Sequence, residues 1–155
     1  MGLVPVLLNR IDHVGVAVFD LDAAVSRYVT TFGLVVVAVE TNDEQGVREA
    51  MLQVSGPDGD GLSSPSGMGS SYVQLLSPLG PDTPVGRFLA KRGEGVHHIG
   101  YAVDDVAVAM EGLTAQGIRV LDSRPRHGSL GASIAFAHPK DLFGVLTELV
   151  QAARG

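Results

Sequence analysis

Four polar residues of metal-ligating type occur at matched places in a repeated sequence. His13 and His98 lie 85 residues apart, within the similar stretches RIDHVGVAV and GVHHIGYAV. Gln74 and Glu148 lie in the middle of two further similar stretches, YVQLLSP and LTELVQA. Two imidazoles, an amide oxygen and a carboxylate suit a divalent cation and leave coordination positions for a substrate. The spacing therefore predicts one metal site shared by the two copies.

A structural role is the alternative for each histidine, because a single buried histidine more often completes a packed core than binds a metal. The repeat itself has the same alternative, a packed strand used twice. Strand alternation, however, places both His13 and His98 on a face shared with a glycine and an alanine, which leaves room beside each imidazole. His97 is expected to face the other way and to be structural.

Each copy begins with a strand and a helix. Asp20 and Asp105 stand where N-caps are expected, and the residues that follow are apolar at every third or fourth position. Gly33 and Gly117 are expected to cap the C-terminal ends of these helices.

Three more strands follow in each copy. They are VVVAVE, EAMLQVS and SYVQLLSPL in the first copy, and IRVLDS, GASIAFAHP and GVLTELVQ in the second. The pattern predicts an α+β fold in which two β-α-β-β-β modules, about 8–79 and 94–151, form one curved, cupped mixed sheet. We expect a single domain over residues 1–155.

Two segments lie outside the repeat. Residues 55–71 are rich in Gly, Ser, Pro and Asp, which predicts a mobile hairpin loop, with a lid over the cleft as a hypothesis. Thr83 as N-cap, Pro84 at the first helical position and Gly93 at the end predict a short linking helix.

Composition narrows the function classes. The 155 residues carry a net charge of −6, which argues against nucleic acid as a partner. Cysteine is absent, so a metal must use imidazole, carboxylate or amide ligands. No apolar run approaches the roughly 18 residues of a membrane span, and the opening stretch lacks the basic region of a signal peptide. We expect a cytoplasmic protein without a membrane partner.

The sequence resembles the vicinal oxygen chelate superfamily (glyoxalase-like fold) and, within it, the methylmalonyl-CoA epimerase family. The stretches that carry the resemblance are IDHVGVAV, NDEQGVREAML, VQLLSPL, VGRFLAKRGEGVHHIGYAVDD, GIRVLDSRPRHG and AFAHPKDLFGVLTELVQ, in order over nearly the whole chain. Only residues 55–71 depart from the family pattern, by being longer.

The resemblance implies metal ligands at His13, Gln74, His98 and Glu148, and a catalytic glutamate at Glu49. A solvated charge is the alternative for Glu49. Glu148 is our candidate for the second catalytic acid/base group. A cation lowers the proton affinity of a bound carboxylate, so Glu148 would act through its unligated oxygen, or a water would take this role.

The reaction that the resemblance implies is epimerisation of (2R)- and (2S)-methylmalonyl-CoA. A proton is removed from and returned to C2 through a metal-stabilised enolate. Co²⁺ is the first candidate, with Mn²⁺, Ni²⁺, Zn²⁺ and Mg²⁺ as alternatives, and a homodimer and a place in propionate metabolism are expected. Ser129, Gly131 and Lys140 are candidates for binding the acyl-CoA substrate, with ordinary solvated loops as the alternative.

Two other functions remain open. One is a glyoxalase I-like metal enzyme acting on a thiol adduct, and the other is a metal-free small-molecule binding protein of the same fold. Glyoxalase I relatives generally carry a carboxylate where this chain has Gln74. The amide leaves one negative charge fewer at the metal, which favours a dianionic partner.

Overall fold

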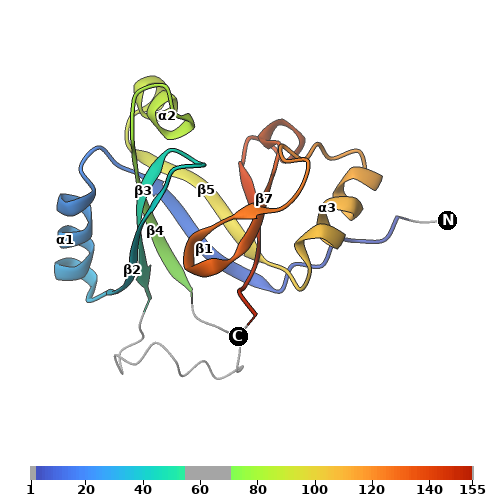
Figure 1. Cartoon of the computed structure of the whole chain (residues 1–155), viewed down its shortest axis with the longest axis horizontal. Coiled ribbons are helices and arrows are strands. Elements are labelled where there is room, and N and C mark those ends of the chain that lie inside the picture. Colours follow the sequence, from blue (N-terminus) through green and yellow to red (C-terminus); the bar gives the residue numbers. More distant parts are fainter. Residues whose placement is uncertain (1–2, 55–70, 155) are drawn as a thin grey trace. The chain divides into compact units, whose positions relative to one another are not determined.

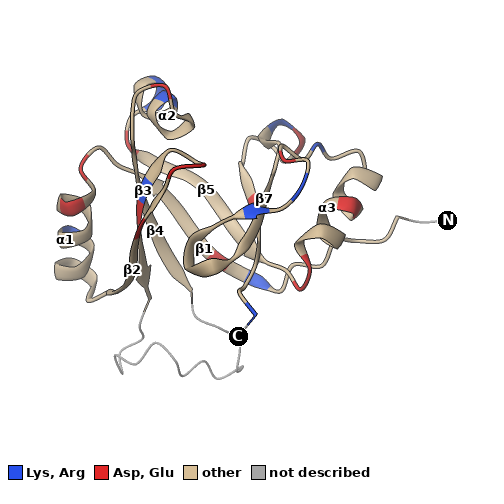
Figure 2. Cartoon of the chain, viewed as in Figure 1, with Lys and Arg blue, Asp and Glu red and all other residues tan. Residues whose placement is uncertain are grey.

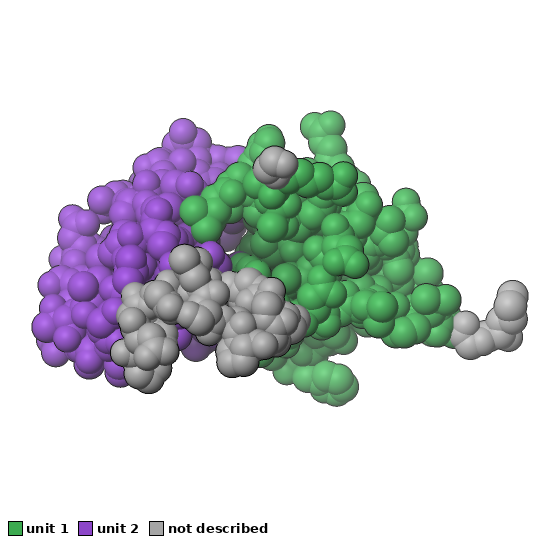
Figure 3. Space-filling view, turned by 90° about the horizontal axis from the view of Figure 1, so that it is seen from below, with its two compact units in different colours: residues 1–12, 98–155 green, residues 13–97 purple. Residues whose placement is uncertain are grey.

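The computed structural model describes residues 3–54 and 71–154, so the loop predicted at 55–71 and its lid hypothesis lie almost wholly outside the described residues. The chain forms two compact units (Figure 3). Unit 1 comprises residues 1–12 and 98–155, and unit 2 comprises residues 13–97.

Unit 2 contains most of the first copy of the repeat. Its elements are β1 (Arg10–Ala17, which begins in unit 1), α1 (Leu21–Phe32), β2 (Val35–Asn42), β3 (Val47–Gln53), β4 (Tyr72–Pro78) and α2 (Pro84–Arg92). The strands lie in the order β2-β3-β4-β1. β1 pairs with β4 in parallel, and the other pairs are antiparallel.

The predicted caps of α1 are confirmed. The Asp20 side chain accepts a hydrogen bond from the backbone N–H of Ala23 at 3.0 Å, and Gly33 ends the helix at φ +68°. This left-handed conformation favours glycine because a Cβ would clash with the backbone. The apolar stripe of α1 packs on Leu52 and Leu75 on one face of the sheet (Figure 1).

The predicted linking helix is also confirmed. Thr83 accepts a hydrogen bond from the N–H of Gly86 at 3.0 Å, and Pro84 occupies the first helical position. Lys91 and Arg92 in the last turn place positive charge at the negative end of the helix dipole (Figure 2, blue on α2).

Unit 1 repeats the same connections. Its elements are most of β5 (Gly95–Ala102), α3 (Val106–Ala115), β6 (Arg126–His127), η1 (Ser129–Gly131), β7 (Ser133–Ala137), η2 (Pro139–Asp141) and β8 (Thr147–Gln151). The strands lie in the order β5-β8-β7-β6, with β5 and β8 parallel and the other pairs antiparallel. Each unit therefore has the same sheet topology.

The predicted capping residues of α3 lie at the two ends of the helix. The Asp105 side chain accepts from the N–H of Val108 at 3.1 Å, as expected of an N-cap. Gln116 is the C-cap residue, and Gly117 follows it in the left-handed conformation at φ +79°. The N–H of Gly117 bonds to Thr114 O and the N–H of Ile118 bonds to Leu113 O, both at 3.0 Å, so the predicted glycine does end the helix.

The strand predicted at 118–123 is wrong. Only an isolated bridge joins Val120 to Ala137, and β6 supplies the fourth strand of unit 1. Asp122 explains the difference. Its Oδ2 accepts the N–H of Phe136 at 2.9 Å and its Oδ1 pairs with Arg126 at 3.1 Å. A side-chain carboxylate thus replaces the carbonyl of a strand ladder.

Candidate active site

The sheet of unit 2 carries three polar side chains on the face opposite α1. Ala50 and Leu75 face the helix, and strand alternation turns Glu49 and Gln74 to the other side. His13 shares that other side. All three are buried, with exposures of 3% for His13 and Glu49 and 5% for Gln74. We call them the half-site of unit 2.

A hydrogen bond joins two of these side chains. Gln74 donates through Nε2 to Glu49 Oε2 at 2.8 Å. In the antiparallel register, Met51 lies opposite Gln74 and Leu76 lies opposite Glu49, so the two polar residues are diagonal neighbours on one face. The amide nitrogen of Gln74 is therefore the atom that faces Glu49, and the carboxylate oxygen accepts.

The burial of Glu49 decides against its alternative as a solvated charge. Its neighbour Arg48 lies on the other face of β3 and pairs with exposed Asp22 at 3.2 Å. Glu49 is instead a buried carboxylate with an amide partner.

The half-site of unit 1 consists of His98 and Glu148. His98 Nε2 lies 3.1 Å from Glu148 Oε2, and both residues are buried. Phe136, which the sequence analysis does not name, lies opposite Glu148 in the sheet. Its ring meets the His98 ring edge-on, with 5.7 Å between the ring centroids. The alternation of side chains along β7 (SIAFA) could have identified Phe136 from the sequence. Ala135 faces α3, so its neighbour Phe136 must face the side that carries Glu148.

The two half-sites have the same register. Gln74 lies opposite Gly15 in unit 2, and Glu148 lies opposite Gly100 in unit 1. In each unit the histidine precedes that glycine by two residues. A glycine opposite each oxygen ligand candidate leaves space over the backbone.

The repeat is not symmetric at the position of Glu49. Glu49 lies opposite Leu76, two residues after Gln74. Ile134 lies opposite Val150, two residues after Glu148. An apolar side chain in unit 1 therefore takes the place that a carboxylate occupies in unit 2.

Comparisons with known proteins agree with this arrangement. A model of the Glyoxalase/Bleomycin resistance protein/Dioxygenase superfamily matches residues 12–136. Ethylmalonyl-CoA/methylmalonyl-CoA epimerase of Cereibacter sphaeroides is 35% identical, over 94% of this chain and 99% of that protein. The chain belongs to this superfamily and, within it, to the methylmalonyl-CoA epimerase family.

Two solved structures of that family support the fold. A variant of Streptomyces coelicolor methylmalonyl-CoA epimerase in complex with 2-nitronate-propionyl-CoA has a TM-score of 0.85 at 49% identity, and covers 96% of this chain and 100% of its own. The Mycobacterium tuberculosis methylmalonyl-CoA epimerase has a TM-score of 0.85 at 37% identity, and the match covers 99% of this chain and 94% of that chain. The predicted α+β vicinal oxygen chelate fold and the assignment to an enzyme of the epimerase family are confirmed. Within the described residues, no helix is long and apolar enough to cross a membrane.

The donor groups of this epimerase-family chain suit a divalent cation. Each of His13, His98 and Glu148 is buried and offers one ligand atom. Ligands at the roughly 2.0–2.2 Å distances typical of such ions lie about 3 Å from one another when adjacent. The separation of 3.1 Å between His98 Nε2 and Glu148 Oε2 fits this spacing.

The substrate-binding candidates lie on loops at the two ends of β7. Ser129 and Gly131 form η1 before the strand, where Gly131 has φ +72°. Lys140 is exposed in η2 after the strand, and its N–H donates to His138 Nδ1 at 3.1 Å. Their role in binding substrate stays a prediction.

An ion pair fixes the η2 loop of unit 1. Arg119 donates to both carboxylate oxygens of Asp141, at 2.9 Å and 3.0 Å, and its backbone N–H donates as well, at 2.9 Å. The side-chain hydrogen bond from Arg119 is the main cause that lowers the pKa of Asp141 to about 2. The loop that leads into β8 is thereby tied to the segment after α3.

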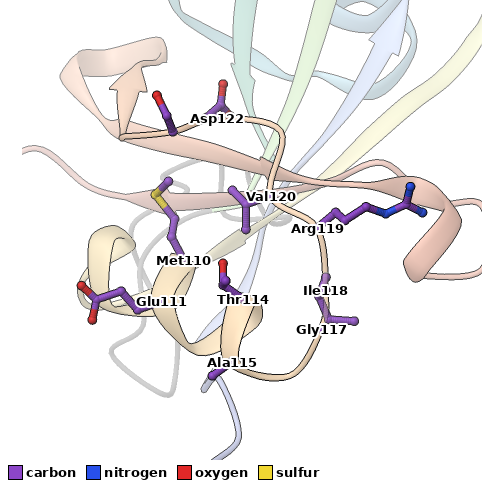
Figure 4. A pocket seen from close by; sticks show the side chains of 10 residues that line it. Met110, Glu111, Thr114, Ala115, Gly117, Ile118, Arg119, Val120 and Asp122 are labelled. Atoms are coloured by element: carbon purple, nitrogen blue, oxygen red, sulfur yellow. The ribbon is translucent and has the colours of Figure 1, made fainter.

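A groove of about 850 Å³ lies between α3 and the segment that follows it, away from the half-site of unit 1. Met110 and Thr114 project from α3 toward Val120 on the segment that follows the helix (Figure 4). Glu148 faces away from α3, so this groove is separate from the half-site of unit 1.

Proposed function

We propose that the chain interconverts (2R)- and (2S)-methylmalonyl-CoA with the help of a divalent cation. A proton would leave C2 on one face, and a proton would return on the opposite face of a planar enolate. Family membership supports this proposal, and one observation carries it. A buried carboxylate, Glu49, is held by a hydrogen bond on the sheet face that also carries His13.

The proposal assigns the cation to the half-sites of both units. His13 and Gln74 would supply an imidazole and an amide oxygen, and His98 and Glu148 an imidazole and a carboxylate. A bound divalent cation would polarise the thioester carbonyl and stabilise the charge that develops on its oxygen. Because the amide nitrogen of Gln74 points to Glu49, its oxygen is the ligand atom.

Glu49 is the proposed base for one face of C2. It is anchored on a central strand of its sheet, between β2 and β4, so its position does not depend on a loop. A positioned general base contributes about 10²–10⁴-fold to the rate.

Glu148 is the proposed acid/base group for the opposite face. Its Oε2 contacts His98, so the proposal assigns proton transfer to Oε1, directly or through a water. Ile134 occupies the place equivalent to Glu49 in unit 1, so that place supplies no carboxylate for this task.

Ser129, Gly131 and Lys140 complete the proposal as contacts of the CoA phosphates, through backbone N–H groups and one ammonium group. Co²⁺ as the cation, a homodimer, a cytoplasmic location and a role in propionate metabolism stay predictions.

Hydrogen exchange at C2 tests the proposed function. The metal-stripped protein, with and without added Co²⁺, is incubated with methylmalonyl-CoA in D₂O, and the C2 proton is followed by ¹H NMR. We expect deuterium incorporation that depends on Co²⁺. Absence of exchange in the loaded protein would refute epimerisation, and turnover of the methylglyoxal–glutathione adduct would favour the glyoxalase I-like alternative.

A further inference from the structure

We infer that Gln74 is a positioning residue for Glu49, in addition to any role as a metal ligand. Its N–H holds one carboxylate oxygen of Glu49 and so fixes which oxygen takes part in proton transfer. The inference rests on the proposed function and adds a reason why an amide stands at this position.

The geometry leaves Gln74 little freedom. Its side chain is buried on β4, with 5% exposure. β4 is paired on both sides, with β1 in parallel and with β3 in antiparallel orientation. Its Nε2 is 2.8 Å from Glu49 Oε2, a short distance typical of a hydrogen bond to a charged acceptor. A buried side chain with this contact holds its partner in one rotamer.

An amide can serve both purposes from one side chain, whereas an ionised carboxylate cannot. An amide donates through nitrogen and offers oxygen on the other side, whereas an ionised carboxylate only accepts. Gln74→Glu would keep an oxygen ligand for a cation, yet it would place two carboxylates at hydrogen-bond distance. Glu49 would then lose its donor and turn away from its partner.

The two epimers separate this role from metal binding. Each epimer presents its C2 hydrogen to one acid/base group, so damage to Glu49 slows hydrogen exchange from one epimer. Loss of the cation slows exchange from both. Gln74→Glu and Glu49→Gln are compared with the wild type on each pure epimer in D₂O, and Co²⁺ affinity is measured by calorimetry.

We expect Gln74→Glu to slow exchange from one epimer at least about tenfold more than from the other, and the same epimer as in Glu49→Gln. In the double variant, that epimer should exchange no more slowly than in Glu49→Gln alone, because both changes act through one group. Gln116→Glu is the matched control, since it also removes an amide donor, to Val4 O, and should leave both rates unchanged.

Equal slowing of both epimers in Gln74→Glu would overturn the inference, and so would slowing of the other epimer or of neither. Additive losses in the double variant would overturn it as well. A Co²⁺-loaded wild type that exchanges neither epimer would instead refute the proposed function, and this inference with it.

Discussion

Glu49 has an apolar neighbour along its strand and a polar neighbour on the adjacent strand. Val47 belongs to a cluster with Val85 and Leu89 of α2, and Gln74 on β4 supplies the hydrogen bond. A buried carboxylate without a partner would cost several kcal/mol, so the amide stabilises its ionised form in place.

Glu49→Gln tests this residue directly. The amide oxygen of the new side chain can accept the same hydrogen bond, so folding and Co²⁺ binding should be retained. We expect kcat to fall by about 10²–10⁴-fold, measured with Co²⁺ affinity and thermal unfolding as controls. Wild-type kcat in this variant would show that Glu49 has no part in proton transfer.

His98→Ala should have a wider effect. The change leaves the Glu148 carboxylate buried beside an empty space, which destabilises by about 1–3 kcal/mol. We expect loss of both Co²⁺ binding and activity, by calorimetry and assay, with the lower stability seen in urea unfolding. His127→Ala, at an exposed position of β6, is the control, and equal losses there would contradict a specific role for His98.

The polar residues of the two half-sites were predictable from the sequence, but the hydrogen bond between Gln74 and Glu49 was not. The repeat alone brings His13 and His98 to equivalent positions. The contact between Glu49 and Gln74 depends on the register of β3 and β4, and no residue pattern in the long connection between them sets this register.

At the scale of elements, the caps of the helices are local and should be separable from the site. Asp105→Ala removes the hydrogen bond to the Val108 N–H at the start of α3. We expect a loss of about 1 kcal/mol in the free energy of unfolding, measured in urea, with unchanged KM. Asp43→Ala, in the exposed turn between β2 and β3, should leave stability unchanged, and a comparable loss there would contradict the assignment.

The ion pair on η2 should respond to acid. The pKa of Asp141 is lowered from 3.8 to about 2, so its stabilising contribution is complete above pH 3.8 and is lost as the pH falls through about 2. Carboxyl ¹³C NMR should give a midpoint near 2 in the wild type and a higher midpoint in Arg119→Ala, still below 3.8 because the backbone N–H of residue 119 continues to donate to Asp141. An unchanged midpoint in that variant would exclude Arg119 as the cause.

Helices and most strands followed from the sequence because their signals are local. Asp20, Thr83 and Asp105 each mark a helix start through one side-chain contact. The stretch IRVLDS also has strand character, but Asp122 bonds to the backbone of β7 and ends the pairing there. A side chain that takes a backbone hydrogen bond away from strand pairing does not change the hydrophobic alternation of the sequence, so the pattern does not reveal it.

At the scale of the whole molecule, binding of the proposed cation should stabilise the folded chain. Binding to the folded state alone stabilises by about 2.7 kcal/mol when the free ion is at 100 times Kd. We expect Co²⁺ to raise the unfolding temperature, measured by calorimetry. His13→Ala and His98→Ala should each abolish the rise, and a rise retained in either variant would contradict the proposed role of that histidine as a ligand.

The isoleucine that replaces the glutamate in the second copy has a consequence for kinetics. Under the proposed mechanism, the forward and reverse directions begin with proton removal by two carboxylates in different surroundings, Glu49 beside Gln74 and Glu148 beside His98. The equilibrium constant still fixes the ratio of kcat/KM for the two directions. Ile134 and Glu49 therefore allow the individual kcat values and the solvent isotope effects to differ between directions, while that ratio stays constant in every variant.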